Sequence, residues 1–105
     1  MMQVKNMVSA RSGRTVSNQF EIISSEAGVI GEYAFQSYDS LCASLKRTEN
    51  GLYKLTIYRD GFYSRTTAKY LRAWLNDHIN PERVPDVLKA AKEPISAGAE
   101  KWEAA

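Results

Sequence analysis

The fold is decided by residues 19–58, which read QFEIISSEAGVIGEYAFQSYDSLCASLKRTENGLYKLTIY. Apolar residues alternate with polar ones over four short runs, as they do in strands that bury one face. These runs are residues 19–24, 29–36, 41–46 and 52–58. Turn-forming residues separate the runs, namely Ala27-Gly28, the segment SYDS at 37–40 and Asn50-Gly51. The pattern predicts a four-stranded antiparallel meander, in which each strand pairs with the next along the chain.

The third run leaves an alternative open. Ser40 could cap a short helix over residues 41–46, because a serine hydroxyl accepts a hydrogen bond from the first free N–H groups of a helix. Against this, Leu41, Ala43 and Leu45 alternate with polar or small residues, which is the period of a strand. We favour the strand for this run.

Two helices are predicted after the strands. Ser64 or Thr66 can cap the first, whose apolar positions recur every three or four residues up to about His78. Asn80-Pro81 ends it, and Pro81 is a suitable residue to open a second, short helix before Pro94. The fold class expected is therefore α+β, a four-stranded antiparallel meander packed by a C-terminal helix, with a second short helix after Pro81.

The rest of the chain lacks a clear hydrophobic period. Residues 1–18 are rich in Ser, Asn and Arg and carry three bases without an acid, so they are interpreted as a flexible basic arm. Residues 19–93 are interpreted as a single α+β domain. Residues 94–105 are interpreted as a polar tail. A chain of 105 residues is about the size of one ordinary domain, so no second domain is expected.

Composition excludes several classes of protein. Cys42 is the only cysteine and His78 the only histidine, so the chain has neither an internal disulfide nor a set of zinc ligands. No metal and no cofactor are expected. No apolar run is long enough to span a bilayer, so no membrane partner is expected. No catalytic motif is present, and the chain is predicted not to be an enzyme. A structure that placed His78 or Cys42 beside a carboxylate in a cleft would reopen that question.

Charge is distributed unevenly along the chain. Although the formal net charge is only +2, residues 43–72 hold seven bases and two acids, whereas residues 19–42 hold four acids and no base. Within the basic block, Arg65, Lys69 and Arg72 recur at helical spacing on one stripe, and aromatic residues lie between the bases. The predicted partner-binding residues come from this block and are Tyr58, Arg59, Tyr63, Arg65, Lys69 and Arg72.

Three interpretations of this basic block remain open. The bases can form an ordinary solvated helix face, or be neutralised by the acidic strands beside them. They can form a protein interface, since such interfaces are enriched in Tyr, Trp and Arg. They can also form a nucleic-acid platform, in which bases stack on aromatic rings and phosphates pair with cations. The oligomeric state is open as well.

Two further stretches carry a resemblance to known proteins. The segment FQSYDS at 35–40, followed by YSRTTAKYLRAWL at 63–75, is similar to a pattern in short uncharacterised phage and prophage proteins, and Gln19-Phe20 matches its start. The resemblance covers about residues 19–75 and carries no catalytic residue. It implies a small virus-encoded accessory protein.

The resemblance suggests a function by analogy. Small phage proteins without enzymatic motifs often inhibit host machinery, and anti-CRISPR proteins have this profile of a compact α+β domain with charged surfaces. The leading expectation is therefore a non-enzymatic protein of the host-cell cytoplasm that binds and inhibits a host defence nucleoprotein or nuclease. Either the basic aromatic face or the acidic residues Glu21, Glu26, Glu32 and Asp39 could make the contact. The alternative expectation is a small nucleic-acid-binding module that uses the same basic aromatic helix face.

Overall fold

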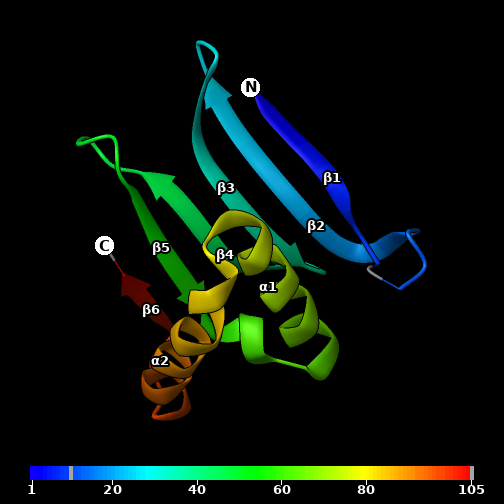
Figure 1. Ribbon diagram of the computed structural model, residues 1–105, viewed down its shortest axis with the longest axis vertical. Helices are drawn as coiled ribbons and strands as arrows, with labels where there is room; N and C mark the ends of the chain where they lie inside the picture. The colour runs from blue at the N-terminus through cyan, green and yellow to red at the C-terminus, as the bar shows by residue number, and fades with distance from the viewer. Residues whose placement is uncertain (10, 105) are drawn as a thin grey trace.

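The computed structural model describes residues 1–9 and 11–104, which form six strands and two α-helices (Figure 1). The strands are β1 (Met2–Val8), β2 (Thr15–Glu26), β3 (Val29–Ser37), β4 (Ser40–Arg47), β5 (Tyr53–Tyr58) and β6 (Lys101–Ala104). The helices are α1 (Arg65–His78) and α2 (Val84–Ser96), preceded by the 3-10 turns η1 (Arg59–Phe62) and η2 (Pro81–Arg83). The chain is α+β, as the sequence predicts.

All six strands belong to one antiparallel sheet in the order β1-β2-β3-β4-β5-β6. The four predicted strands correspond to β2 through β5, and residues 41–46 lie inside β4, so the choice of a strand over a helix is confirmed. At the β2–β3 turn, Ala27 and Gly28 both have positive φ angles of 53° and 79°, which is the geometry of a tight hairpin turn. The predicted count of four strands is wrong, because a further strand is added at each edge.

The flexible arm predicted for residues 1–18 is one source of this error. Residues 2–8 form β1, which pairs with β2, and β2 itself begins at Thr15 rather than at residue 19. Met7 is the one buried residue of β1. The strand is therefore held by its backbone ladder to β2 and not by an apolar stripe, so it has almost no signature in the hydrophobic pattern.

The polar tail predicted for residues 94–105 is the other source. Helix α2 continues through Pro94 to Ser96, and residues 101–104 form β6, which pairs with β5. Trp102 lies opposite Ile57 in this ladder and packs against the core. Strand β6 spans only four residues, too few for a period of two to be recognised. The domain therefore extends beyond residue 93 to the last described residue.

One face of the sheet, called here the covered face, packs against both helices. A single row of residues in register crosses five strands on this face: Glu21, Phe35, Ala43, Ile57 and Trp102. Phe35, Ala43 and Ile57 are completely buried, together with Leu71 of α1 and Ala91 of α2. Figure 1 shows α1 lying across the strands and α2 beside β6 on the same side of the sheet. The core of the domain lies between these two layers.

The opposite face, called here the open face, carries the alternate residues. Its matching row is Val4, Ile22, Ala34, Ser44, Thr56 and Glu103. Val4 is 56% exposed, and among the described residues no helix lies over this row. Exposure falls toward the middle of this row, where the small residues Ala34, Ser44 and Thr56 are buried.

Helix α1 is held in position at both ends. At its start the Ser64 hydroxyl accepts a hydrogen bond from the Thr67 N–H at 3.1 Å, so of the two predicted caps, Ser64 and Thr66, the structure has Ser64. The Thr67 hydroxyl in turn contacts the buried Ser37 hydroxyl of β3 at 2.9 Å. At its end the Ile79 N–H donates to the Leu75 carbonyl, so His78 is the last helical residue. These anchors place the C-terminal end of α1 over β2 and β3.

Candidate functional site

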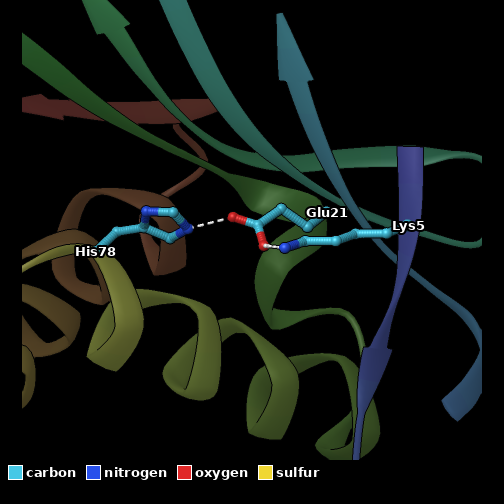
Figure 2. A network of polar contacts seen from close by, with 3 residues as sticks. All are labelled: Lys5, Glu21 and His78. Atoms are coloured by element: carbon cyan, nitrogen blue, oxygen red, sulfur yellow. Dashed lines mark hydrogen bonds and ion pairs between the residues drawn. The ribbon is translucent and has the colours of Figure 1, made fainter. Parts of the chain in front are cut away.

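A polar network joins the end of α1 to the sheet (Figure 2). The His78 Nε2 contacts Glu21 Oε1, and these two residues are 57 positions apart in the chain. The ammonium group of Lys5, on β1, lies 3.7 Å from the other oxygen of the same carboxylate. The side chains of Glu21 and His78 are each only 14% exposed. Three separate elements, β1, β2 and α1, therefore meet at one half-buried carboxylate.

The network fixes the charge of Glu21. The hydrogen bond from His78 holds the pKa of the Glu21 carboxyl below its ordinary value. Burial acts in the opposite direction, and the positive charges of His78 and Lys5 lower this pKa further. An ionised carboxylate only accepts hydrogen bonds, so Nε2 carries the proton in this contact. The second ring nitrogen, Nδ1, lies on the side of the ring that points away from Glu21 in Figure 2.

The imidazole ring of His78 is also fixed by two aromatic neighbours. Its centroid lies 4.6 Å from that of Tyr33 and 4.8 Å from that of Trp74, with interplanar angles of 46° and 43°. Tilted arrangements at these distances are favourable between aromatic rings. A ring held by one ionised partner and two aromatic contacts has little freedom to rotate.

His78 lines a cleft of about 620 Å³ at the C-terminal end of α1. We call this cavity the His78 cleft, and its volume lies within the range of small-molecule sites. Strands β3 to β6 supply one wall, and the α1–η2–α2 corner supplies the other. The cleft is lined by Tyr33, Leu45, Tyr53, Leu55, Asp77, His78, Ile79, Asn80, Arg83, Val87 and Ala104. His78 therefore lies beside a carboxylate and also lines a cleft, but its partner Glu21 is not among the residues that line that cleft, so the structure meets only part of the condition for reconsidering catalysis.

Cys42 does not share this environment. Its side chain is completely buried, and burial raises the pKa of the thiol to about 11. A thiol is a poor nucleophile when its pKa lies so far above neutrality. It packs beneath η1, where Gly61 approaches so closely that an added Cβ would lie 3.3 Å from the Cys42 carbonyl oxygen. Cys42 is therefore a packing residue.

Two of the predicted partner-binding residues lie together in a shallow basic depression. Lys69 and Arg72 of α1 are joined by Lys92 of α2 around a space of about 140 Å³ whose apolar side is formed by Phe62, Ala68 and Leu88. We call this feature the basic hollow. The Lys92 ammonium lies 5.7 Å from the centre of the Phe62 ring, and that of Lys69 lies 5.5 Å from the centre of the Tyr70 ring. Both distances are in the range of cation–π contacts, which orient the two lysines.

The other predicted residues are not brought into this hollow. Tyr63 is 85% exposed and lines a separate hollow of about 540 Å³ with Tyr38 at the start of α1. Tyr58 is two residues along β5 from Thr56, so it belongs to the open face of the sheet. Arg59 lies in η1, and Arg65 is an exposed residue at the first position of α1.

The sequence analysis missed Lys92 and the pairing of Glu21 with His78. Lys92 lies on a helix whose packing beside α1 depends on tertiary structure, which no local pattern reports. The sequence predicts an acidic surface for Glu21 and a helix end for His78, and neither placement indicates their contact. The sequence signal for Glu21 is weak. The alternation of β2 puts this acid on the face of the strand that packs against the helices, in register with the apolar Phe35.

Residues 2–88 match the model of a protein family described as "Family of unknown function (DUF8033)". The chain belongs to this family. The matched part runs from β1 into α2, so it includes Lys5, Glu21 and His78 but ends before Lys92 and β6. Neither the comparison with curated proteins nor that with solved structures found a match.

Two structural searches of the described residues gave negative results. No group of three or more His, Cys, Asp or Glu side chains among them could hold a metal ion. In the same part of the chain, neither helix has the length and apolar character needed to cross a membrane.

Proposed function

We propose that this protein is a non-enzymatic binding protein of the phage-encoded type, which attaches to a host defence nucleoprotein through the basic hollow and inhibits it in the host cytoplasm. The observation that carries the proposal is the convergence of Lys69, Arg72 and Lys92 around one depression whose lining contains no carboxylate. Two of these cations were singled out from the sequence, and the third comes from a different helix.

Electrostatics favours an anionic partner for this hollow. Lys69 and Arg72 lie three residues apart on the same helix, and like charges at this spacing repel each other by a few tenths of a kcal/mol. Lys92 adds a third positive charge at the same place. A phosphate group or a cluster of carboxylates would remove this repulsion and form charge-assisted hydrogen bonds.

The apolar lining of the hollow favours a close-packed contact with a protein partner over a contact made by charge alone. Phe62 is partly buried against the core and Leu88 is 7% exposed, so the floor of the hollow is rigid. Arginine and aromatic residues around a small apolar centre are typical of the residues that dominate binding energy in protein interfaces. We therefore favour an anionic surface held on a protein, such as the bound nucleic acid of a nucleoprotein, over free nucleic acid.

The test is affinity capture from host-cell lysate with two matched double variants. Lys69→Glu/Arg72→Glu reverses two charges at the basic hollow, and Lys46→Glu/Arg47→Glu reverses two exposed charges at the far end of β4. We expect the wild type and the β4 variant to retain a nucleoprotein through nuclease treatment, and the hollow variant to lose it. The captured nucleoprotein's activity should fall when the purified wild-type protein is added.

Other results would contradict the proposal in different ways. Capture that is equal in both double variants would exclude the basic hollow. Capture of nucleic acid alone, lost on digestion and falling steeply with salt, would indicate direct nucleic-acid binding by counterion release. Folding of each variant is checked by circular dichroism, and both pairs lie on the surface, so neither is expected to unfold the domain.

A further inference from the structure

We propose that the His78 cleft is a binding site for a small zwitterionic aromatic molecule of the aromatic α-amino acid class. This site is separate from the basic hollow: it lies at the C-terminal end of α1 and shares no lining residue with the hollow. The cleft combines three features, namely its volume, the aromatic side chains that line it and two oppositely charged side chains.

The body of the cleft is suited to an aromatic ring. Its volume of about 620 Å³ is that of a site for a small organic molecule. Leu45 and Leu55 line it from the sheet, and Val87 lines it from α2. An aromatic ring bound there would exchange water contacts for apolar ones on two sides, which is the main source of affinity for such ligands.

Three aromatic side chains line the cleft in fixed positions, two from the sheet and one from α1. Tyr33 lies between the other two, with its ring centre 6.3 Å from that of Tyr53 and 4.6 Å from that of His78. The Tyr53 hydroxyl donates to the Ile30 carbonyl at 3.1 Å, and Glu21 holds the His78 ring. Because these rings are already oriented, a planar ligand would lose little affinity to their ordering.

The rim carries one acid and one base. Asp77 lies in the last turn of α1, where the partial negative charge of the helix end adds to that of the carboxylate. Arg83 lies at the end of η2 and lines the same cleft. Among the ion pairs of the described residues, neither side chain has a partner. Both charges are therefore available to a ligand.

Opposite charges at one rim select for a ligand that carries both. A primary ammonium group fits Asp77, and a carboxylate fits the forked guanidinium of Arg83. The Asn80 amide oxygen already accepts the Glu82 N–H at 3.0 Å, so its NH₂ group can donate to the same carboxylate. A purely cationic or purely anionic molecule would leave one of the two rim charges facing a like charge or nothing.

The test is isothermal titration calorimetry of the full chain with a matched set of four probes. L-Phenylalanine carries ring, ammonium and carboxylate; 3-phenylpropanoate lacks the ammonium; phenethylamine lacks the carboxylate; L-alanine lacks the ring. We expect saturable binding of L-phenylalanine, about tenfold weaker binding of the two probes that lack one charge, and no detectable binding of L-alanine.

Two variants assign each charge to its residue. Arg83→Gln should weaken L-phenylalanine about tenfold and leave phenethylamine unchanged, because that probe has no carboxylate to lose. Asp77→Asn should weaken L-phenylalanine and leave 3-phenylpropanoate unchanged. Lys92→Gln, in the basic hollow, serves as the matched control and should change none of these affinities. All three positions are exposed, so these substitutions leave the fold intact.

Several results would overturn the proposal. Absence of saturable binding of L-phenylalanine would exclude this ligand class from the cleft. Equal binding of L-phenylalanine and L-alanine would exclude the aromatic side chains of the cleft as the recognition element. Retention of full L-phenylalanine affinity in both Arg83→Gln and Asp77→Asn would place the ligand elsewhere on the protein. None of these outcomes depends on the basic hollow, so this proposal and the proposed function fail independently.

Discussion

The two faces of the sheet differ in the size and the burial of their side chains. On the covered face, Phe35 and Ile57 are completely buried and the helices supply a second layer of contacts. On the open face, Ile22 and Phe20 are only half-buried and Val4 is 56% exposed. The two faces use the same strands and the same backbone ladder. What separates them is that the helices cover large apolar side chains on one face, whereas the buried residues in the middle of the other face, Ala34, Ser44 and Thr56, are small.

This difference shows where the stability and the candidate sites of the domain originate. The covered face holds the core, the Glu21–His78 pair and the His78 cleft, so the core and this candidate site lie on one side of the sheet. The open face contributes small and polar residues that keep water-exposed apolar surface limited. Substitutions on the two faces should therefore lower the free energy of unfolding by different amounts, which can be ranked from the largest to the smallest.

The largest contrast is expected between two phenylalanines. Phe35→Ala removes a fully buried ring from the covered face and should lower the free energy of unfolding by about 3–5 kcal/mol. Phe20→Ala removes a half-buried ring from the open face and should lower it by about 1 kcal/mol. Urea unfolding followed by circular dichroism measures both. Equal losses would mean that the open face is packed as tightly as the covered one.

A smaller effect is expected from the ion pair at the edge of the covered face. Glu21→Gln keeps the shape of the side chain but removes its charge, and should lower the free energy of unfolding at pH 7 by about 1 kcal/mol. The pKa of Glu21 is depressed in the folded state, so its contribution is present above the carboxyl pKa of the unfolded chain and is lost as pH falls through the folded value. The difference between wild type and variant should therefore shrink on acidification below about pH 4.

Glu49→Gln is the control for this measurement, because Glu49 is an exposed residue between β4 and β5. Its unfolding curve should follow that of the wild type at each pH. A gap between wild type and Glu21→Gln that stays constant from pH 7 to pH 3 would show that the charge of Glu21 does not stabilise the fold.

The next smaller loss of stability is expected at the N-terminal cap of α1. Ser64→Ala removes the side-chain cap of the helix and should cost about 1 kcal/mol or slightly less. Thr66→Ala, two residues later and exposed, should be close to neutral. Thermal unfolding of both variants tests the contrast. A larger loss of stability in Thr66→Ala than in Ser64→Ala would show that Ser64 is not the residue that caps the helix.

The smallest effect is expected on the open face at its outer strand. Val4→Thr keeps the β-branched shape and exchanges a methyl group for a hydroxyl on a side chain that is 56% exposed. Surface substitutions of this kind usually change stability by less than about 0.5 kcal/mol. Destabilisation well above this value, measured by urea unfolding, would indicate that another surface covers β1 in solution.

The parts of the fold that sequence predicted are those in which local signals agree. The turn at Ala27-Gly28, the strand inside β4 and the Ser64 cap each combine a suitable residue with a matching hydrophobic period. Strands β1 and β6 lie at the edges and gain their order from a partner's backbone. Their own side chains therefore show little of the apolar–polar alternation from which strands are predicted.

The candidate sites were less predictable for a related reason. The helical spacing of Lys69 and Arg72 was readable, but the addition of Lys92 required the packing of α2 beside α1. Tyr58 and Tyr63 are predicted as partner-binding residues because they are close in sequence to the bases of the block. In the structure Tyr58 lies on the open face of the sheet and Tyr63 lines a separate hollow. The contact of Glu21 with His78 joins β2 to the far end of α1, and no local period reports a pairing over that separation.

The order in which the strands pair also sets a route for folding. Strands β1 to β5 each pair with their neighbour along the chain, so every one of these steps closes a short loop at low entropic cost. Strand β6 is different, because it reaches β5 only after both helices have been made. Strand β6 should therefore dock last during folding and detach first during local opening. The amide of Arg59, which donates to the Glu100 carbonyl at 2.8 Å, is the natural reporter of that step in hydrogen exchange.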